Sequence, residues 1–268
     1  MNQKRLILLF PLCLLALLIG VLGWLTWREV RQERLNRQLI DAIKQEDTTT
    51  ALSALKQGAD ANARDEKQTL PAWKDLWNRL RGKRPPPSKA PTALLLALHF
   101  KEESVGIEFP KENLPFIQAL LTHGAQVNVP DDDGQSPLTY ALVQDMSATS
   151  RLLIQHGVRV TQGADAEEDM LLEAALYPVD TDVMEMMLQR GANPNGPNDI
   201  GWKPLAAAVM AQNPDKVRVL LHYHADPNVL VGVGQDSGSA LSFAEQEASS
   251  DSKMRQIAQM LQAAGAKE

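Results

Sequence analysis

The apolar residues of this chain fall into short segments that are separated by polar turns. The clearest example lies between Asp131 and Gly157, where Leu138 and Ala141 predict one short helix and residues 152–154 predict a second. Ser136 followed by a proline suits the first turn of a helix, and the glycine at 157 suits the left-handed residue that ends one. Neither helix is long enough to bury its apolar face alone, so each pair needs a neighbour on both sides.

The same pattern recurs along the chain. A leucine followed three residues later by an alanine marks the first helix of each pair, at Leu39/Ala42, Leu94/Ala97, Leu138/Ala141, Leu171/Ala174, Leu205/Ala208 and Leu241/Ala244. The turn after the second helix recurs at residues 124, 157, 191 and 224, a period of about 33 residues. This period predicts one solenoid of stacked helix pairs and not several separate cores.

These segments resemble the motifs of ankyrin-repeat proteins. The T-P-L-H-x-A motif of that family is approximated by residues 136–141 and by Lys203-Pro204-Leu205 with Ala208, and its L-L-x-x-G-A-x-x-N motif by residues 120–128 and 187–195. The resemblance covers roughly residues 36–266. It implies an all-α fold, an ankyrin-repeat solenoid of about six helix-turn-helix repeats, whose concave surface binds protein. His224 departs from the motif because it replaces a turn glycine, so its repeat is expected to be less regular.

The N-terminus carries a different signal. Residues 1–5 form a short basic tail, and residues 6–27 contain no charged residue over a length close to the ~20 residues that cross a bilayer as a helix. Trp24 and Trp27 stand at one end of this run, where tryptophans favour the membrane interface. The sequence therefore predicts that one transmembrane helix, a signal anchor at 6–27, precedes the repeats. A cleaved signal peptide is the alternative, although no small-residue cleavage site follows the run.

An arginine-rich segment, residues 28–37, joins the predicted anchor to the repeat domain, residues 38–268. No glycine or proline occurs between Trp24 and Gln57, so we expect a stiff helical stalk that continues into the first repeat. Two signals for orientation disagree. The arginines of the stalk favour a cytoplasmic repeat domain, whereas a minimal basic tail before an apolar helix favours repeats outside the cytoplasm, which is our prediction for this single-pass protein of the inner or plasma membrane.

The regular period is interrupted by a basic insertion at residues 66–90. Its two tryptophans lie one helical turn apart, beside an excess of lysine and arginine. One interpretation is contact with anionic lipid headgroups; the other is that the tryptophans pack on the first repeats while the charges are solvated. The candidate membrane-surface residues are Trp73, Trp77, Arg79, Arg81, Lys83 and Arg84.

Charge is segregated along the chain, which has a net charge of −6. Because the N-terminus and the insertion are basic, the repeats hold the acidic excess, which argues against nucleic acid as a partner and allows a basic protein partner. The candidate partner-binding residues on the concave surface are Asp131, Asp132, Asp133, Asp199, Trp202 and Asp236. Tryptophan is enriched at interface hot spots, but packing of Trp202 against a neighbouring repeat is an equal alternative.

The sequence offers no catalytic, cofactor-binding or metal-binding constellation. Cys13 is the only cysteine, and the five histidines are dispersed over several repeats. His222 and His224 lack a third ligand at a useful spacing, and no glycine-rich phosphate loop is present. We therefore predict a protein without enzymatic activity, cofactor, metal or small-molecule substrate.

Two functions are compatible with these features. The first is a membrane-tethered interaction module that binds a protein partner in an inhibitor, immunity or scaffold role through the concave ankyrin surface. The second is a structural envelope component that attaches to anionic lipid through the basic insertion. Fold alone does not choose between them.

Overall fold

The computed structural model describes residues 3–65, 90–98, 113–160, 170–196, 201–232 and 238–267. In chain order the elements are α1 (Gln3–Lys44), α2 (Thr48–Lys56), α4 (Ala93–Leu98), α5 (Leu114–Thr122), α6 (Pro137–Val143), α7 (Ser147–Gln155), α8 (Met170–Leu176), α9 (Thr181–Gln189), α10 (Pro204–Met210), α11 (Pro214–His222), β1 (Leu230–Val231), β2 (Gly238–Ser239), α12 (Ala240–Glu247) and α13 (Ser252–Ala263).

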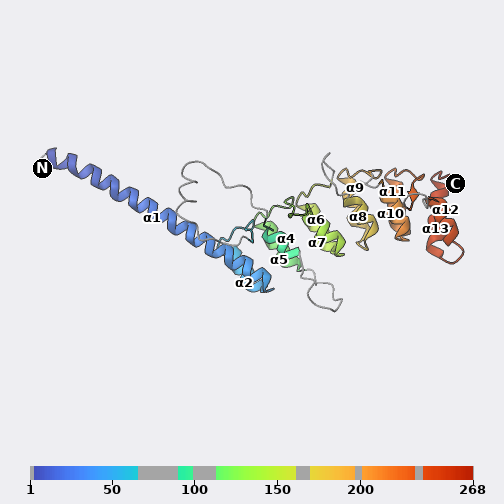
Figure 1. Ribbon diagram of the computed structural model, residues 1–268, viewed down its shortest axis with the longest axis horizontal. Helices are drawn as coiled ribbons and strands as arrows, with labels where there is room; N and C mark the ends of the chain where they lie inside the picture. The colour runs from blue at the N-terminus through green and yellow to red at the C-terminus, as the bar shows by residue number, and fades with distance from the viewer. Residues whose placement is uncertain are drawn as a thin grey trace.

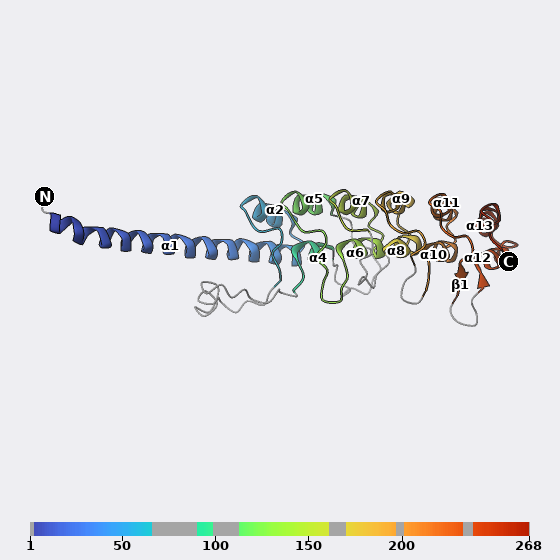
Figure 2. The same ribbon diagram turned by 90° about the horizontal axis from the view of Figure 1, so that it is seen from above.

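The helices pair in sequence and stack in two layers. The end of α1 and helices α4, α6, α8, α10 and α12 are the first helices of their pairs, and α2, α5, α7, α9, α11 and α13 are the second helices. Figure 2 shows the second helices along one side of the stack and the first helices along the other. Each first helix packs on its own partner and on the first helix of the next pair. The predicted stack of helix pairs is confirmed in the described part of the chain.

Local sequence explains where the helices begin and end. The Ser136 hydroxyl accepts a hydrogen bond from the Thr139 amide at 3.1 Å, and Pro137 is the first helical residue of α6. At the other end of the pair, Gly157 has φ of +87°, which a side chain would oppose. His224 takes the equivalent turn position at φ of +65°, so one repeat adopts the left-handed conformation without glycine.

The core is built from small and aliphatic residues at the predicted positions. All six leucines of the Leu-x-x-Ala pairs are buried, from Leu39 in α1 to Leu241 in α12. The alanines let the layers approach closely, and Ala141, Ala174 and Ala208 are fully buried. Burial runs continuously from the end of α1 to α13, so the stack has one elongated core.

At several junctions between repeats, an asparagine side chain links one turn to the turn of the next repeat. Asn62 donates to the Gly124 carbonyl at 2.9 Å and accepts from the Gln126 amide at 2.8 Å. Asn128 and Asn195 make the same two contacts with the turns that follow them. The residue at the equivalent place after α7, in the third repeat, is Thr161.

The junction between α7 and α9, where this asparagine is missing, is stabilised by ion pairs. Arg151 of α7 donates to both carboxylate oxygens of Asp182 in α9, at 2.6 and 2.9 Å, and also to Asp180. Ser147 accepts from the Asp180 amide at 2.8 Å. The guanidinium holds the pKa of Asp182 below its usual range.

Helix α1 joins the N-terminus to the repeats without a linker. It is one helix of 42 residues, so the predicted stalk at 28–37 lies within it, and the continuous helix expected from the lack of glycine and proline is confirmed. Figure 1 shows its N-terminal part extending away from the stack. Gln32 donates to the Gly58 carbonyl at 2.9 Å, and Asn36 accepts from the Asp60 amide at 2.8 Å. These two side chains of α1 replace the asparagine that a preceding repeat would supply.

Within the part of the chain that the structure describes, no helix has the length and apolar character needed to cross a membrane. Within the predicted anchor at 6–27, the side chains of residues 6–16, 18, 19 and 22 lie outside the described part. The signal anchor therefore stays a prediction. The basic insertion also lies outside the described part, except for Ala90, as does the segment at 101–112.

The all-helical fold carries one short antiparallel pair. Leu230 pairs with Ser239, and Val231 pairs with Gly238. Val229 and Val231 are buried while Leu230 is 60% exposed, an alternation with period two that is typical of a strand.

A charged residue occupies one core position. Lys216 is the third residue of α11, where α9 places Val183 and α13 places Met254, and it is only 1% exposed. Its amine donates to the Ala174 carbonyl at 2.7 Å and to the Tyr177 carbonyl, both at the C-terminal end of α8. Burial lowers the pKa of Lys216 to about 8, against the opposing effect of Asp145 and Asp180.

Candidate partner-binding surface

The free face of the first helices and the loops that precede them form the surface on which the sequence placed a partner. Figure 2 shows the loop between α5 and α6 extending on the side away from the second helices. This surface is therefore bounded by helices on one side and by loops on the other. A module of stacked helix pairs with such an open face defines the protein as a repeat solenoid suited to binding.

The three aspartates before α6 have different environments. Asp131 accepts from the Asp133 amide at 3.0 Å, from the Gln135 amide at 2.8 Å and from the Tyr140 hydroxyl at 2.5 Å. Its carboxylate therefore closes the turn. Asp132 and Asp133 are exposed, and their carboxylates make no ion pair or hydrogen bond within the described residues. Of the three, these two are available to a partner.

Trp202 is half-buried against the core. Its indole N–H donates to the Gly232 carbonyl at 3.2 Å, so it joins the loop before α10 to the end of β1. This contact corresponds to the packing alternative, while the residue as a whole remains partly exposed. Asp199 and Asp236 lie outside the described residues, as do the six candidate membrane-surface residues of the insertion. A role for any of these residues in binding stays a prediction.

Sequence reasoning missed the apolar part of this surface. Beyond α1, three large apolar side chains are exposed in the described part of the chain: Val143 at 39%, Met210 at 36% and Leu230 at 60%. Val143 and Met210 are the last residues of α6 and α10. Each lies two residues after the alanine of its Leu-x-x-Ala pair, so an alignment of the repeats could have found them.

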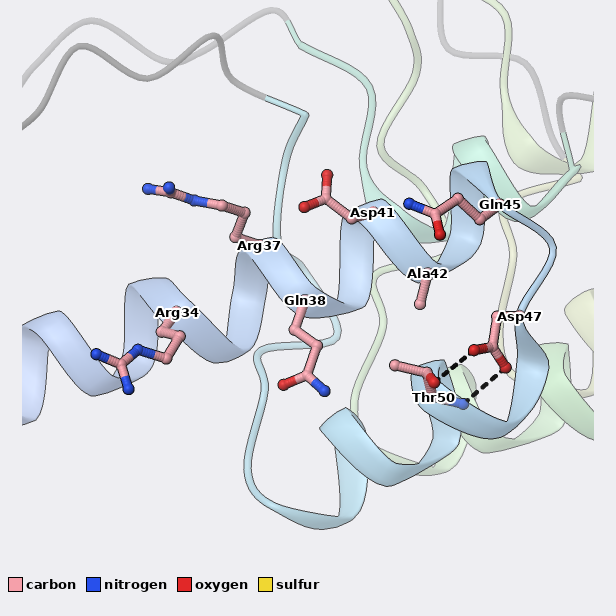
Figure 3. A pocket seen from close by; sticks show the side chains of 8 residues that line it. All are labelled: Arg34, Arg37, Gln38, Asp41, Ala42, Gln45, Asp47 and Thr50. Atoms are coloured by element: carbon pink, nitrogen blue, oxygen red, sulfur yellow. Dashed lines mark hydrogen bonds between the residues drawn. The ribbon is translucent and has the colours of Figure 1, made fainter.

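An open hollow of about 380 Å³ lies between α1 and α2. Figure 3 shows Arg34 and Arg37 with their guanidinium groups directed away from Asp47. Asp47 accepts from the Thr49 hydroxyl at 2.6 Å, from the Thr50 hydroxyl and from the Thr50 amide at 3.0 Å, and these bonds lower its pKa to about 2. The polar side chains that line the hollow are exposed or half-buried, so it presents no desolvated charge to a ligand. The hollow is part of the polar outer surface of the first helix pair, at the N-terminal end of the stack.

The described residues contain no group of three histidine, cysteine, aspartate or glutamate side chains that could hold a metal ion. One histidine has a structural role. The Nδ1 atom of His123 lies 2.8 Å from the Ala119 carbonyl, where it helps to cap the end of α5.

Comparison with known proteins agrees with this geometry. Residues 107–198 match the family model of ankyrin repeats in three copies. The crystal structure of an ankyrin repeat domain from Acinetobacter baumannii AYE, solved at 1.00 Å, aligns with a TM-score of 0.59 and 23% sequence identity over 85% of this chain and 98% of that domain. None of the curated proteins matches. The chain contains ankyrin repeats and has the all-helical ankyrin-repeat fold.

Ankyrin repeats generally mediate protein–protein interaction and are typically non-enzymatic. The predicted class of fold and the general role of a protein-binding module are therefore supported.

Proposed function

We propose that this protein is a membrane-tethered interaction module that binds a protein partner through the concave surface of its repeats, outside the cytoplasm. The observation that carries the proposal is α1, which runs without interruption from the apolar N-terminal segment into the first repeat. A helix shared between an anchor and a binding domain fixes the distance of that domain from the membrane.

The environment of the tryptophans supports a membrane boundary near residue 27. The Arg28 guanidinium lies 5.5 Å from the centre of the Trp24 ring, and that of Arg31 lies 5.8 Å from the centre of the Trp27 ring. Both rings are more than half exposed, so neither packs on the repeats. Amphipathic rings and guanidinium groups at one level of a helix suit the headgroup region of a bilayer.

Contacts at the base of α1 support a rigid tether. Gln32 and Asn36 bind the turn at Gly58 to Asp60, so the projecting part of α1 cannot swing freely against the first repeat. A partner bound to the concave surface would therefore be held at a defined height above the membrane. An inhibitor, an immunity protein or a scaffold for a membrane-surface protein would each use this arrangement.

Fractionation of cells that express the full chain tests the tether. Leu17→Arg with Val21→Arg places two charges within the apolar segment, and each costs roughly 3 kcal/mol near the centre of a membrane helix. We expect this variant to leave the membrane fraction. The matched control, Val30→Arg with Gln38→Arg, adds the same charges to exposed positions beyond the segment and should stay with the membrane. Equal distribution of the two variants would refute the tether.

Orientation is tested by protease protection of a tag placed after Glu268. Digestion as soon as the outer barrier is opened would support repeats outside the cytoplasm. Protection until the inner membrane is broken would place them in the cytoplasm and refute that part of the proposal. The role as a binding module is tested separately, since it requires a protein partner with a Kd below ~10 μM.

A further inference from the structure

Three first helices end in an apolar residue at the same place in the fold. Val143, Leu176 and Met210 are the last residues of α6, α8 and α10, and we call them the apolar row. Val143 and Met210 are exposed, and Leu176 between them is half-buried. Because α6 packs on α8 and α8 packs on α10, the row crosses the middle of the stack from helix to helix.

The spacing of the row matches a helical ligand. Adjacent packed helices lie about 8–10 Å apart, so neighbouring residues of the row are separated by roughly that distance. An α-helix rises ~1.5 Å per residue, so side chains seven residues apart on one face are ~10.5 Å apart. A ligand helix that runs along the stack can therefore place one apolar residue per heptad against each member of the row.

A helix fits this surface better than an extended segment. The row presents side chains from helices and offers no unpaired strand edge at which an extended peptide could bond its backbone. An extended peptide pressed against apolar side chains would lose water from amide groups that then have no partner. A helix satisfies those groups internally.

The charged residues near the apolar row indicate the charge of the helix that would bind there. The carboxylates of Asp132 and Asp133 are exposed and unpaired in the described part, in the loop that precedes α6. Two described lysines at the ends of first helices are ion-paired, Lys203 with Asp226 at 3.3 Å and Lys44 with Asp65 at 2.5 Å. Helix α6 has seven residues and is about 10 Å long; these carboxylates lie in the loop before its N-terminal end, and Val143 is its last residue.

We propose that the partner binds as a basic amphipathic helix that lies along Val143, Leu176 and Met210, with its cationic flank toward Asp132 and Asp133. This inference rests on the proposed interaction function and adds to it the chemical class of the bound segment. The apolar row supplies the contact area. The two carboxylates favour a positively charged helix and determine on which side of the row its charges lie.

Photocrosslinking in cells with the full chain tests this surface. Benzoylphenylalanine is placed in separate variants at Val143 and at Met210, and in control variants at Gln155 and Gln189, the last residues of the second helices α7 and α9. We expect both row positions to crosslink to one protein, in a segment with net positive charge and apolar residues seven apart. The control positions should not crosslink to that segment.

A pair of charge variants gives the quantitative test. Val143→Asp with Met210→Asp should weaken co-purification of the crosslinked protein at least tenfold, because two carboxylates would face its apolar stripe. Gln155→Asp with Gln189→Asp adds the same charge to the other layer and should leave binding unchanged. All four residues are exposed, so the fold tolerates both changes.

The outcomes separate this inference from the broader function. Crosslinks only from the control positions, or to an acidic or non-helical segment, would overturn the inference while the protein remains an interaction module. No protein crosslinked at any of the four positions would overturn the inference and would also count against the proposed function.

Discussion

Because of the buried lysine of α11, the free energy of unfolding of this protein is expected to change with pH in the alkaline range. Lys216 is 1% exposed, and burial lowers its pKa from 10.5 to about 8. Between these two values the unfolded chain binds a proton that the folded chain releases, so the free energy of unfolding rises as the pH rises. Below pH 8 the cost of burying the charged amine is fully present, and above about pH 10.5 it is relieved.

The size of the effect follows from the shift. One pKa unit corresponds to about 1.4 kcal/mol, so the whole shift amounts to about 3 kcal/mol. About 2 kcal/mol of this falls between pH 7 and pH 10, because the unfolded lysine is still largely protonated at pH 10. The negative charges of Asp145 and Asp180 oppose the effect of burial on the pKa of Lys216.

The assay compares urea unfolding of the wild-type protein with that of Lys216→Met at pH 7, 8, 9 and 10. The stability of the methionine variant relative to wild type should fall by about 2 kcal/mol over this range, since only wild type gains stability from the lysine. Lys253→Met, which removes an exposed lysine from α13, should show no such trend. If Lys216→Met does not fold, Lys216→Thr replaces it, because α2 and α7 carry threonine at this position. A difference that stays constant with pH would refute the reasoning.

Three further changes test the turns and caps by the shift in the urea midpoint. His224→Gly should stabilise the protein by about 1 kcal/mol, because His224 holds φ of +65° where five other turns use glycine; a loss of stability would show that the imidazole makes a compensating contact. Asn195→Ala should cost about 2 kcal/mol, since it removes bonds to the His224 carbonyl and the Asp226 amide, whereas Asn193→Ala removes one bond within its own turn and should cost about half as much. Ser136→Ala should cost about 1 kcal/mol through loss of the cap on α6, and Ser136→Thr should restore most of it; equal stability of the two variants would exclude the cap as the cause.

The sequence was sufficient for features that depend on neighbouring residues. Ser136-Pro137 predicts the start of α6, and Gly157 predicts the turn after α7, because caps and left-handed turns need specific residue types over a few positions. The period of about 33 residues then predicts how such units stack. The order of helices and the leucine core followed from these local signals.

Features that depend on the next repeat could not be predicted in the same way. Asn62 reads as a polar turn residue, yet its two partners lie more than 60 residues away in sequence. Lys216 reads as a solvated lysine near the start of a helix, and its burial follows from the position of α8. The exposure of Val143 depends on what the neighbouring repeats leave uncovered. In each case the repeat alignment could indicate an unusual residue, but only the packing shows its consequence.

Lys216 also connects the stability of the stack to the candidate surface. Its amine holds the carbonyls of Ala174 and Tyr177, and Leu176 of the apolar row lies between them in the chain. Methionine at this position would remove the cost of a buried charge, about 3 kcal/mol at pH 7, but would leave two carbonyls without their donor at roughly 1–3 kcal/mol each. These opposing effects nearly cancel, so the lysine contributes little net stability at neutral pH. Its two hydrogen bonds instead hold the C-terminal end of α8, where Leu176 forms the middle of the apolar row.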